Sequence, residues 1–506
     1  MSKPSIPPGT RDFLPLEMQK RNFIFDTIKK YFHLYGFVQI ETPAVEKLDT
    51  LLGKYGDEGD KLIFKILNSG IGRETIEKKV NSKRVIEENY EYEEVPISKK
   101  EQQAMADAFI NMFVELMKHD DFTEKALRYD LTVPFARYVV QHRNDITFPF
   151  KRYQIQPVWR ADRPQKGRYR EFFQCDADII GSDSLLNEIQ LIQLMDNVYN
   201  ELGIPVTIKL NNRKIFGGIA EFFSMADKVN DLVTILDKIE KIGELEVKQL
   251  LREKGITDEM FQLFDTIILS AVRNFFDGGK LILEKNIEND LGFISDLKKH
   301  EKISPIFNKG LEELEFIFNF FKTNSLKKAC IEFDIRLARG LNYYTGSIIE
   351  VKANAGTLTS SITGGGRYDD LTGIFGLPNV SGVGISFGID RIFDIMNELN
   401  LFEGKLGTTA PVKVLFLNLG DEEANHSLQL VTELRKAGIS ADVYPDKIKE
   451  VKQYDYAVKL QVPFICIVRE NNVATKIYEL KNIVSKERWN LSIEKIIDEL
   501  LKYKTT

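Results

Sequence analysis

The chain has 506 residues, of which 43% are hydrophobic and 28% charged, and its formal net charge at pH 7 is −6. This length allows about three domains of a soluble globular protein, and the acidic balance excludes a chain that is basic throughout, so any RNA contact must come from local basic patches. The 3 cysteines and 5 histidines lie at spacings that fit no metal site or Cys/His nucleophile. No signal peptide or membrane span is visible, so we expect a cytoplasmic protein with reduced thiols.

A helix and a short strand are predicted near the N-terminus. Residues 17–35 carry apolar side chains at helical spacing, Gly36 is a stop signal, and Phe37 to Ile40 predicts a strand. Because proline cannot donate to a sheet ladder, Pro43 predicts an edge or a bulge, and an ordinary strand end fits equally well.

Residues 69–125 are rich in Lys, Glu, Ser and Asn and predict an exposed insertion, helical near 104–117. The following run, Leu127-Arg-Tyr-Asp-Leu-Thr-Val-Pro134, predicts a strand with Asp130 and Thr132 on one face. A carboxylate and a hydroxyl on one face can hold an ammonium group, although a solvated edge strand is the simpler interpretation of the local pattern.

Two alternating segments around a polar loop predict a β-hairpin. One face is apolar, and the other carries Arg, Gln and Asp. Between Lys151 and Arg170 the chain has many basic residues and a single acid, Asp162. Guanidinium groups bind phosphate in bidentate fashion, so this face suits a polyanionic ligand, and an exposed hairpin with a solvated charged face is the alternative. The polar face comprises Arg152, Gln154, Gln156 and Arg160, then Arg170, Phe172, Gln174, Asp176 and Asp178.

Residues 212–326 predict a helical module, because Leu232, Ile235, Ile239 and Ile242 recur at helical spacing. The sequence pattern of the part before residue 212, which this module interrupts, resumes at Ile331.

Two glycine-rich runs follow. Gly364-Gly-Gly-Arg-Tyr-Asp-Asp370 could cradle phosphate, but a tight turn or a flat strand that a ligand approaches closely is favoured. Gly382-Val-Gly-Ile-Ser-Phe-Gly-Ile-Asp-Arg391 predicts a strand of small residues followed by the start of a helix.

The last hundred residues predict a separate domain after a linker at 408–411. Strands at Val412–Leu419, Ser440–Tyr444 and Phe464–Val468 alternate with helices, which implies a parallel or mixed sheet with helices on its faces. The first helix is predicted at Asp421–Ala437 and the last near Leu491–Tyr503.

The hairpin loop, Arg163-Pro-Gln-Lys-Gly-Arg-Tyr-Arg-Glu-Phe172, closely resembles the second signature motif of class II aminoacyl-tRNA synthetases, in the version of histidyl-tRNA synthetases. Tyr35-Gly-Phe-Val-Gln-Ile-Glu-Thr-Pro43 resembles the first motif and Gly382–Arg391 the third. Arg339-Gly-Leu-Asn-Tyr-Tyr344 resembles the Arg-Gly-Leu-Asp-Tyr-Tyr of histidyl enzymes, with Asn342 in place of the Asp.

The resemblance implies an α+β catalytic domain with an antiparallel sheet flanked by helices, divided between 1–211 and 327–407. A helical insertion at 212–326 would touch the tRNA acceptor arm, and an α/β domain at 411–506 would bind the anticodon. The first motif would build the interface of a homodimer.

The implied reaction is the activation of L-histidine by ATP, with Mg²⁺, to histidyl-adenylate, and transfer of the histidyl group to the 3′ end of tRNA(His). The substrate carboxylate is already a nucleophile, so the first step needs positioning and charge stabilisation rather than a general base. Arg391 near a helix N-terminus opposes the helix dipole, which is understandable if it faces ATP. The implied site residues are Arg160 and Arg339 for catalysis; Arg160, Arg168, Phe172 and Arg391 for ATP; Asp130, Thr132, Gln174, Asp178 (where the family usually has Glu), Arg339, Tyr343 and Tyr344 for histidine; and Arg163 and Gln165 for the tRNA acceptor end.

Two other functions are compatible with this fold. One is a non-catalytic paralogue, a regulatory subunit that senses histidine or tRNA; the other is a class II synthetase for a different amino acid. The arginines Arg160, Arg168, Arg339 and Arg391 favour an enzyme, and the run from Arg339 to Tyr344 favours histidine.

Overall fold

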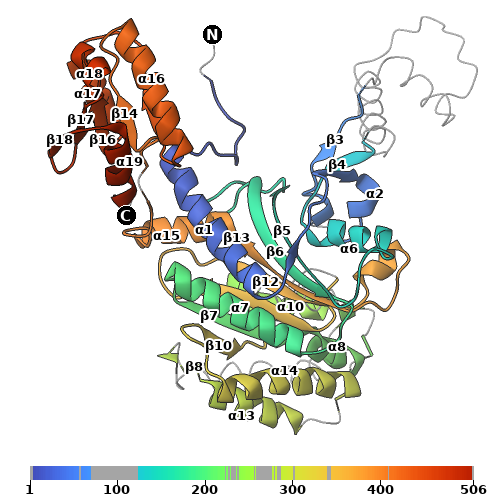
Figure 1. The fold of residues 1–506 in the computed structure, drawn as a ribbon. Helices are drawn as coiled ribbons and strands as arrows, with labels where there is room; N and C mark the ends of the chain where they lie inside the picture. Colours follow the sequence, from blue (N-terminus) through green and yellow to red (C-terminus); the bar gives the residue numbers. More distant parts are fainter. Residues whose placement is uncertain are drawn as a thin grey trace, which may run out of the picture. The chain divides into compact units, whose positions relative to one another are not determined.

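The computed structural model describes residues 4–55, 59–69, 123–222, 224–225, 228–229, 235, 239–255, 257, 276–277, 280–281, 286–299, 303–338, 343–407 and 409–503 (Figure 1). Its contacts form two compact units, one of residues 1–12 and 24–401 and the other of residues 13–23 and 402–506. The predicted helix at 104–117, Leu232, Arg339, Asn342 and Thr408 lie outside the described residues.

An eight-stranded sheet is the frame of the first unit, and it confirms the predicted antiparallel α+β architecture. Its inner pairs are antiparallel, and only the pairs at its two edges are parallel. The strands, in spatial order, are β1 (Val38–Gln39), β5 (Phe150–Trp159), β6 (Glu171–Ile180), β13 (Gly382–Gly388), β12 (Thr363–Tyr368), β11 (Ser347–Ala353), β7 (Val206–Asn212) and β10 (Cys330–Phe333).

Helix α7 (Leu186–Leu202) and residues 24–34 of helix α1 (Pro15–Leu34) cover the apolar face of this sheet (Figure 1). The ring of Phe32 lies 5.1 Å from that of Tyr153 on β5, and the ring of Tyr199 lies 5.8 Å from that of Phe387 on β13. Because side chains of a strand alternate between faces, the polar residues of β5 and β6 point away from these helices. The helix predicted at 17–35 is confirmed, and Gly36 follows it with a positive φ of 78°.

A second, three-stranded sheet lies before the hairpin, with the order β2 (Val45–Lys47), β4 (Lys125–Leu127) and β3 (Lys65–Ile66). The strand predicted to carry Asp130 and Thr132 is wrong, because β4 ends at Leu127 and Thr132 begins helix α6 (Thr132–Gln141). Pro134 fits the first turn of a helix, where its missing N–H leaves no hydrogen bond unmade. Asp130 instead accepts the N–H of Val133 at 3.1 Å.

The stretch predicted as a helical module contains four helices in its described part, together with a pair of two-residue strands, β8 (Phe276–Asp277) and β9 (Lys280–Leu281). The first and last helices touch closely, since a Cβ on Gly218 would lie 2.5 Å from the backbone N of Phe307. The helices are α8 (Arg213–Phe222), α10 (Ile239–Glu253), α13 (Ile287–Lys298) and α14 (Pro305–Thr323).

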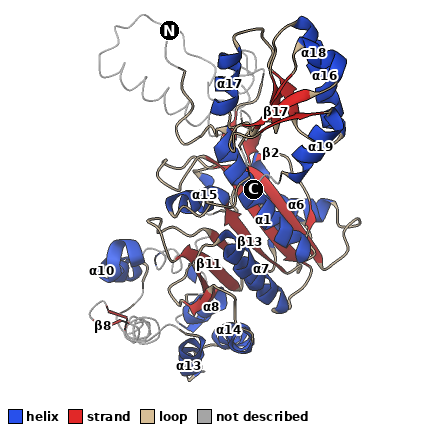
Figure 2. Cartoon of the chain, turned by 60° about the vertical axis from the view of Figure 1, so that its left-hand side comes forward, coloured by secondary structure: helices blue, strands red, loops and turns tan. Residues whose placement is uncertain are grey.

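The second unit contains a mixed five-stranded sheet with helices on both faces, as predicted (Figure 2). Helices α16 (Asp421–Lys436) and α19 (Ile493–Lys502) pack on one face, and α17 (Glu450–Lys459) packs on the other. The two antiparallel strands β17 (Tyr478–Asn482) and β18 (Arg488–Leu491) were not predicted, although buried Tyr478 and Leu480 alternate with charged residues. In spatial order the strands are β15 (Ala441–Val443), β14 (Val414–Phe416), β16 (Phe464–Ile467), β17 (Tyr478–Asn482) and β18 (Arg488–Leu491).

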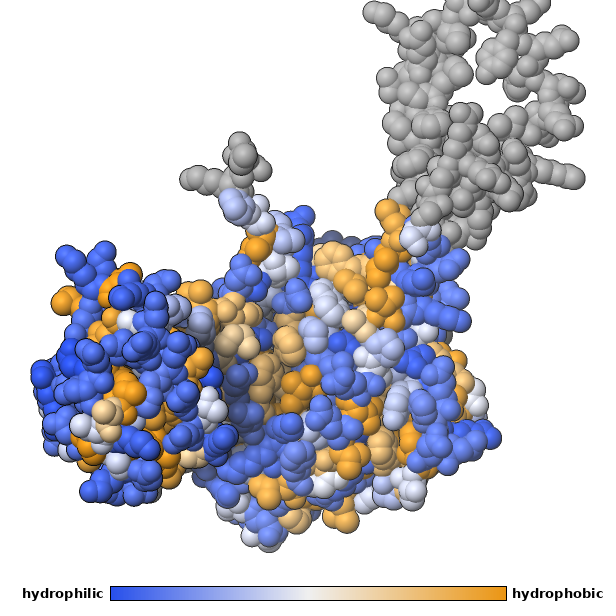
Figure 3. Space-filling view, turned by 45° about the horizontal axis from the view of Figure 1, so that its top comes forward, coloured by the Kyte–Doolittle hydropathy of each residue, from blue (hydrophilic) through white to orange (hydrophobic). Residues whose placement is uncertain are grey.

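Within the described ranges, no helix combines the length and the apolar character that a membrane crossing requires. The face seen in Figure 3 mixes hydrophobic and hydrophilic residues.

Candidate active site

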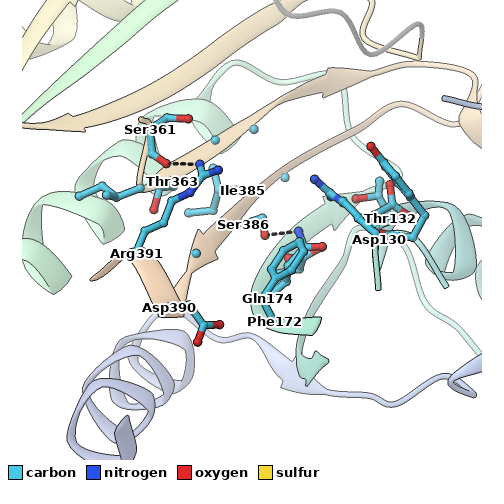
Figure 4. A pocket seen from close by; sticks show the side chains of 18 of the residues that line it. Asp130, Thr132, Phe172, Gln174, Ser361, Thr363, Ile385, Ser386, Asp390 and Arg391 are labelled. Carbon is cyan, nitrogen blue, oxygen red and sulfur yellow. Dashed lines mark hydrogen bonds between the residues drawn. The ribbon is translucent and has the colours of Figure 1, made fainter. Parts of the chain in front are cut away.

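The polar face of the eight-stranded sheet forms the floor of a pocket (Figure 4). The predicted hairpin is confirmed, with β5 and β6 paired from Phe150 opposite Ile180 to Trp159 opposite Glu171. Its polar face is not solvated, since Arg152 and Gln154 are both 0% exposed. The alternative of an exposed charged hairpin is therefore wrong.

Strand β13 leaves room for this floor by carrying small residues. On β13, Gly388, Ser386 and Gly384 lie opposite Gln174, Asp176 and Asp178 of β6, respectively. A Cβ on Gly384 would overlap the carboxylate of Asp178. The strand of small residues predicted from the sequence is thus confirmed, and its glycines are needed for side chains of the neighbouring strand.

Most of the predicted site residues converge on this one pocket. Arg163 and Gln165 instead lie exposed in the hairpin loop and do not line it. The residues that do line the pocket are Asp130, Thr132, Arg160, Arg168, Phe172, Gln174, Asp178, Tyr343, Tyr344 and Arg391.

At one end of the floor, Asp178 is held by two residues that the sequence had not singled out for a role. The Nη2 atom of Arg152 lies 2.7 Å from its Oδ2, and the Tyr368 hydroxyl donates to its Oδ1 at 2.6 Å. Burial raises the pKa of Asp178 and Arg152 opposes that shift. Arg152 lies on the polar face of the hairpin and Tyr368 in the glycine-rich run, so the sequence marked both segments. It could not show that either side chain contacts Asp178.

The carboxylate of Asp130 lies among aromatic hydroxyls. Tyr55 donates to Oδ1 at 2.9 Å, and the Tyr343 hydroxyl lies 3.5 Å from Oδ2. Burial raises the pKa of Asp130, and its bonds and nearby arginines oppose the shift. Tyr55 was missed, because nothing in its local pattern connects it with Asp130.

Three guanidinium groups reach the same pocket from different elements. Arg160 lies over the rings of Tyr129 and Phe172, with its Cζ 4.3 and 5.1 Å from the ring centroids. Arg168 pairs with Asp162 at 2.7 Å. Arg391, in helix α15 (Ile389–Glu398), donates to the carbonyls of Gly167 and Ser361 at 2.7 and 2.6 Å (Figure 4).

The N-terminal segment ties the hairpin loop to helix α15, an arrangement that no sequence pattern had suggested. Arg11 forms an ion pair with Asp390, lies 3.4 Å from Asp394, and stacks 3.6 Å above the ring of Tyr169. The second carboxylate oxygen of Asp390 accepts the backbone N–H of Phe173 on β6 at 3.1 Å. One arginine thus joins three segments that surround the pocket.

No group of three or more His, Cys, Asp or Glu side chains in the described part of the chain could hold a metal ion. Mg²⁺ that enters with a nucleotide is held mainly by phosphate oxygens and water, so the single carboxylates of this pocket fit such an ion without a dedicated cage.

The chain is similar to known proteins over nearly its whole length. The profile of the family described as histidyl-tRNA synthetase matches residues 85–392, and that of the anticodon binding domain matches residues 413–503. A histidine–tRNA ligase of Bacteroides fragilis is 50% identical over 503 residues, which are 99% of this chain and 100% of the relative. One of Azobacteroides pseudotrichonymphae is 49% identical over 499 residues, 98% of each chain. The crystal structure of histidyl-tRNA synthetase from Nostoc sp. PCC 7120 superposes with a TM-score of 0.72 at 26% identity, covering 99% of this chain and 100% of that one. The chain belongs to the histidyl-tRNA synthetase family.

Proposed function

We propose that this chain activates L-histidine with ATP and transfers the histidyl group to the 3′ end of tRNA(His). The observation that carries the proposal is a pocket with two kinds of polar group. Arg160 and Arg168 offer positive charge to phosphates, Arg391 lines the pocket beside them, and Asp130 and Asp178 offer carboxylates to an amino acid. Relatives that match this chain over nearly their full length are named histidine–tRNA ligase, which favours a catalyst over a regulatory subunit.

In the first step, the histidine carboxylate attacks the α-phosphate of ATP and pyrophosphate leaves. Arg160 and Arg339 would stabilise the charge that develops on the α-phosphate, and Arg168 would hold the outer phosphates. Phe172 and Arg391, which both line the pocket, would bind the adenine by stacking and by cation–π attraction. Bound Mg²⁺ would supply further neutralisation of phosphate charge.

Histidine would be recognised at both of its polar ends. Asp130, Thr132 and Gln174 would bind its α-ammonium group, and Asp178 and Tyr344 its imidazole. Arg152 and Tyr368 would act from behind by fixing the orientation of Asp178. A buried carboxylate that is built to bond an imidazole rejects apolar amino acids strongly, because it would lose a partner when they bind.

Contact with tRNA(His) is proposed at three places. Arg163 and Gln165 would meet the acceptor end, the helical insertion would touch the acceptor arm, and residues 411–506 would bind the anticodon. The exposure of Arg163 and Gln165, and the match of residues 413–503 to an anticodon binding domain, support this assignment.

The enzyme is proposed to work as a cytoplasmic homodimer. Large apolar side chains are exposed near the edge strand β1 of the first unit: Leu34 is 68% exposed, Val38 53% and Phe148 38%. A second copy that covers these side chains would remove them from water.

The test is amino-acid-dependent exchange between ATP and pyrophosphate, measured with all twenty amino acids and Mg²⁺. We expect exchange with histidine alone. Arg339→Ala should abolish it, and the exposed-site control Arg143→Ala should not. Folded protein that binds histidine but exchanges with no amino acid would instead be a regulatory paralogue.

A further inference from the structure

Three polar side chains on two neighbouring strands form a line across the pocket floor. Ser386 of β13 lies directly opposite Asp176 of β6, and Gln174 is the next residue of β6 on the same face. Gln174 is 9% exposed and Asp176 1%, so little water competes for their hydrogen bonds. None of the assigned roles involves Asp176 or Ser386.

The hydrogen bonds along this line have a direction. Gln174 donates from Nε2 to the Ser386 hydroxyl oxygen at 2.7 Å (Figure 4). Ser386 lies directly opposite Asp176 on the same face of the strand pair, and its hydroxyl lowers the pKa of that acid. Because an ionised carboxylate can only accept, the single proton of Ser386 is the donor available to Asp176, and the Ser386 oxygen accepts from Gln174.

This direction leaves acceptor atoms without donors. Of the residues described, Gln174 Oε1 and Asp176 Oδ1 are buried and accept no hydrogen bond. Leaving a buried acceptor unpaired is costly, so native structures nearly always supply a partner. The α-ammonium of an amino acid carries three N–H donors, which makes it a suitable partner for Gln174 Oε1.

The charges around Asp176 make its ionisation sensitive to pH near neutrality. Arg152 faces it from β5, Asp178 lies two residues along β6, and Asp130 lies in the loop before α6. Arg128, which follows β4, also interacts with it electrostatically. Burial raises the pKa of Asp176 to about 7; Asp178 and Asp130 add to this shift, and Arg152 and Ser386 oppose it.

We propose that Asp176 is a positioning residue that determines, through Ser386, which end of the Gln174 amide faces the amino-acid substrate. The proposal rests on the proposed histidine activation. When Asp176 is ionised, it accepts the Ser386 proton, Ser386 accepts from the Gln174 NH₂, and the amide oxygen is offered to the α-ammonium. When Asp176 is protonated, its O–H donates to Ser386, the Ser386 proton turns to Gln174 Oε1, and the NH₂ group meets the ammonium, to which it can offer no acceptor.

The main test is the KM for histidine between pH 6 and pH 9, measured by pyrophosphate exchange beside the KM for ATP. In the unmodified enzyme the KM for histidine should rise by up to about tenfold for each pH unit below the pKa of Asp176. Asp176→Asn should keep the KM high at every pH, because its amide donates to Ser386 as the protonated acid does. Ser386→Ala should remove the same pH dependence, since no hydroxyl transmits the state of Asp176.

We call the hydrogen-bonded line Asp176–Ser386–Gln174 the relay, and Asp176→Asn and Ser386→Ala the relay variants. Controls separate the effect of the relay from other effects of pH and substitution. Histidine itself titrates in this range, so only the difference between enzyme and variants counts, and Asp183→Asn, at an exposed acid, should keep the original profile. The KM for ATP should change by less than about twofold in both relay variants, which a general loss of structure would not allow.

Calorimetry of histidine binding in two buffers of different ionisation enthalpy supplies a readout that needs no catalysis. Below pH 7 the unmodified enzyme should release more protons on binding histidine than the Asp176→Asn and Ser386→Ala enzymes, whose proton exchange should come from histidine alone. An Asp176→Asn enzyme with the original pH profile would overturn the proposal. A Ser386→Ala enzyme that keeps the profile would also overturn it, since Asp176 would then act without Ser386. Absent exchange combined with proton-coupled binding would refute the proposed function alone.

Discussion

At the scale of single residues, the floor of the pocket concentrates charge that water does not reach. Arg152 and Asp178 are almost completely buried and 2.7 Å apart, with Asp176 close by. A buried ion pair is weak evidence for stability, but removing one partner leaves an uncompensated charge. Arg152 is therefore the residue whose loss should affect this floor most.

We expect Arg152→Met to lower the free energy of unfolding by about 3–5 kcal/mol at pH 8, because two buried carboxylates lose their cation. The loss should be smaller at pH 6, where these acids are more easily protonated. Urea unfolding at both pH values measures it, with exposed Arg143→Met as the control. Equal losses at both pH values would show that packing, not charge, is responsible.

Asp176 should also make stability depend on pH. Its folded-state pKa of about 7 is above its ordinary value of 3.8, so the unfolded chain loses this proton first and stability falls as pH rises from about 4 to 7. Asp176→Asn should then be more stable than the original protein at pH 8, by about 1–3 kcal/mol, although it binds histidine less well. Thermal unfolding at pH 5 and pH 8 checks this, and a variant less stable at pH 8 would contradict the assigned pKa.

At the scale of elements, the glycines of β13 leave room for a carboxylate of the neighbouring strand β6 over the paired strands. Gly384→Ala would put a methyl group where the Asp178 carboxylate lies, between paired strands that cannot move apart cheaply. Displacing a substrate-binding group by about 1 Å can lower the reaction rate about 100-fold. We expect a loss of this order in kcat/KM for histidine. Gly292→Ala in helix α13, where nothing lies within 4 Å of the new Cβ, should leave it unchanged.

The N-terminal segment should act on ATP more than on histidine. Arg11 connects Asp390, next to Arg391 in α15, with Tyr169, next to Arg168 in the hairpin loop. Arg11→Ala should raise the KM for ATP roughly tenfold, equivalent to about 1.4 kcal/mol, with a smaller change in the KM for histidine. Arg11→Lys should restore only part of the affinity for ATP, since a lysine ammonium cannot replace the planar guanidinium group with its several donors. The exposed Lys29→Ala is a control, and equal rises in both KM values would count against the link.

At the scale of the whole molecule, we expect activation and transfer to use different surfaces. Arg163 and Gln165 are exposed in the hairpin loop and do not line the pocket. Arg163→Ala should therefore reduce tRNA(His) aminoacylation about tenfold more than it reduces pyrophosphate exchange. Rates of both reactions on one preparation decide this, and parallel losses would place Arg163 in the activation step.

The amino-acid sequence by itself determined the elements whose signal is local. Period-two alternation predicted the β5–β6 hairpin, helical spacing predicted α1, and the run of small residues predicted β13 followed by α15. The wording and order of these runs also pointed to the family. Local pattern failed where strand and helix look alike, as at Asp130 and Thr132, which precede and begin a helix rather than lie on a strand.

Only the tertiary structure decided which side chains meet. Tyr368 and Asp178 are 190 residues apart in sequence, and Arg11 and Asp390 are 379 apart. Their contacts depend on the order of strands β6, β13 and β12 and on where the N-terminal segment lies, and no short-range periodicity encodes either. The same order places Ser386 between Gln174 and Asp176 and closes a polar strand face under the pocket, where burial gives its carboxylates their unusual pKa values.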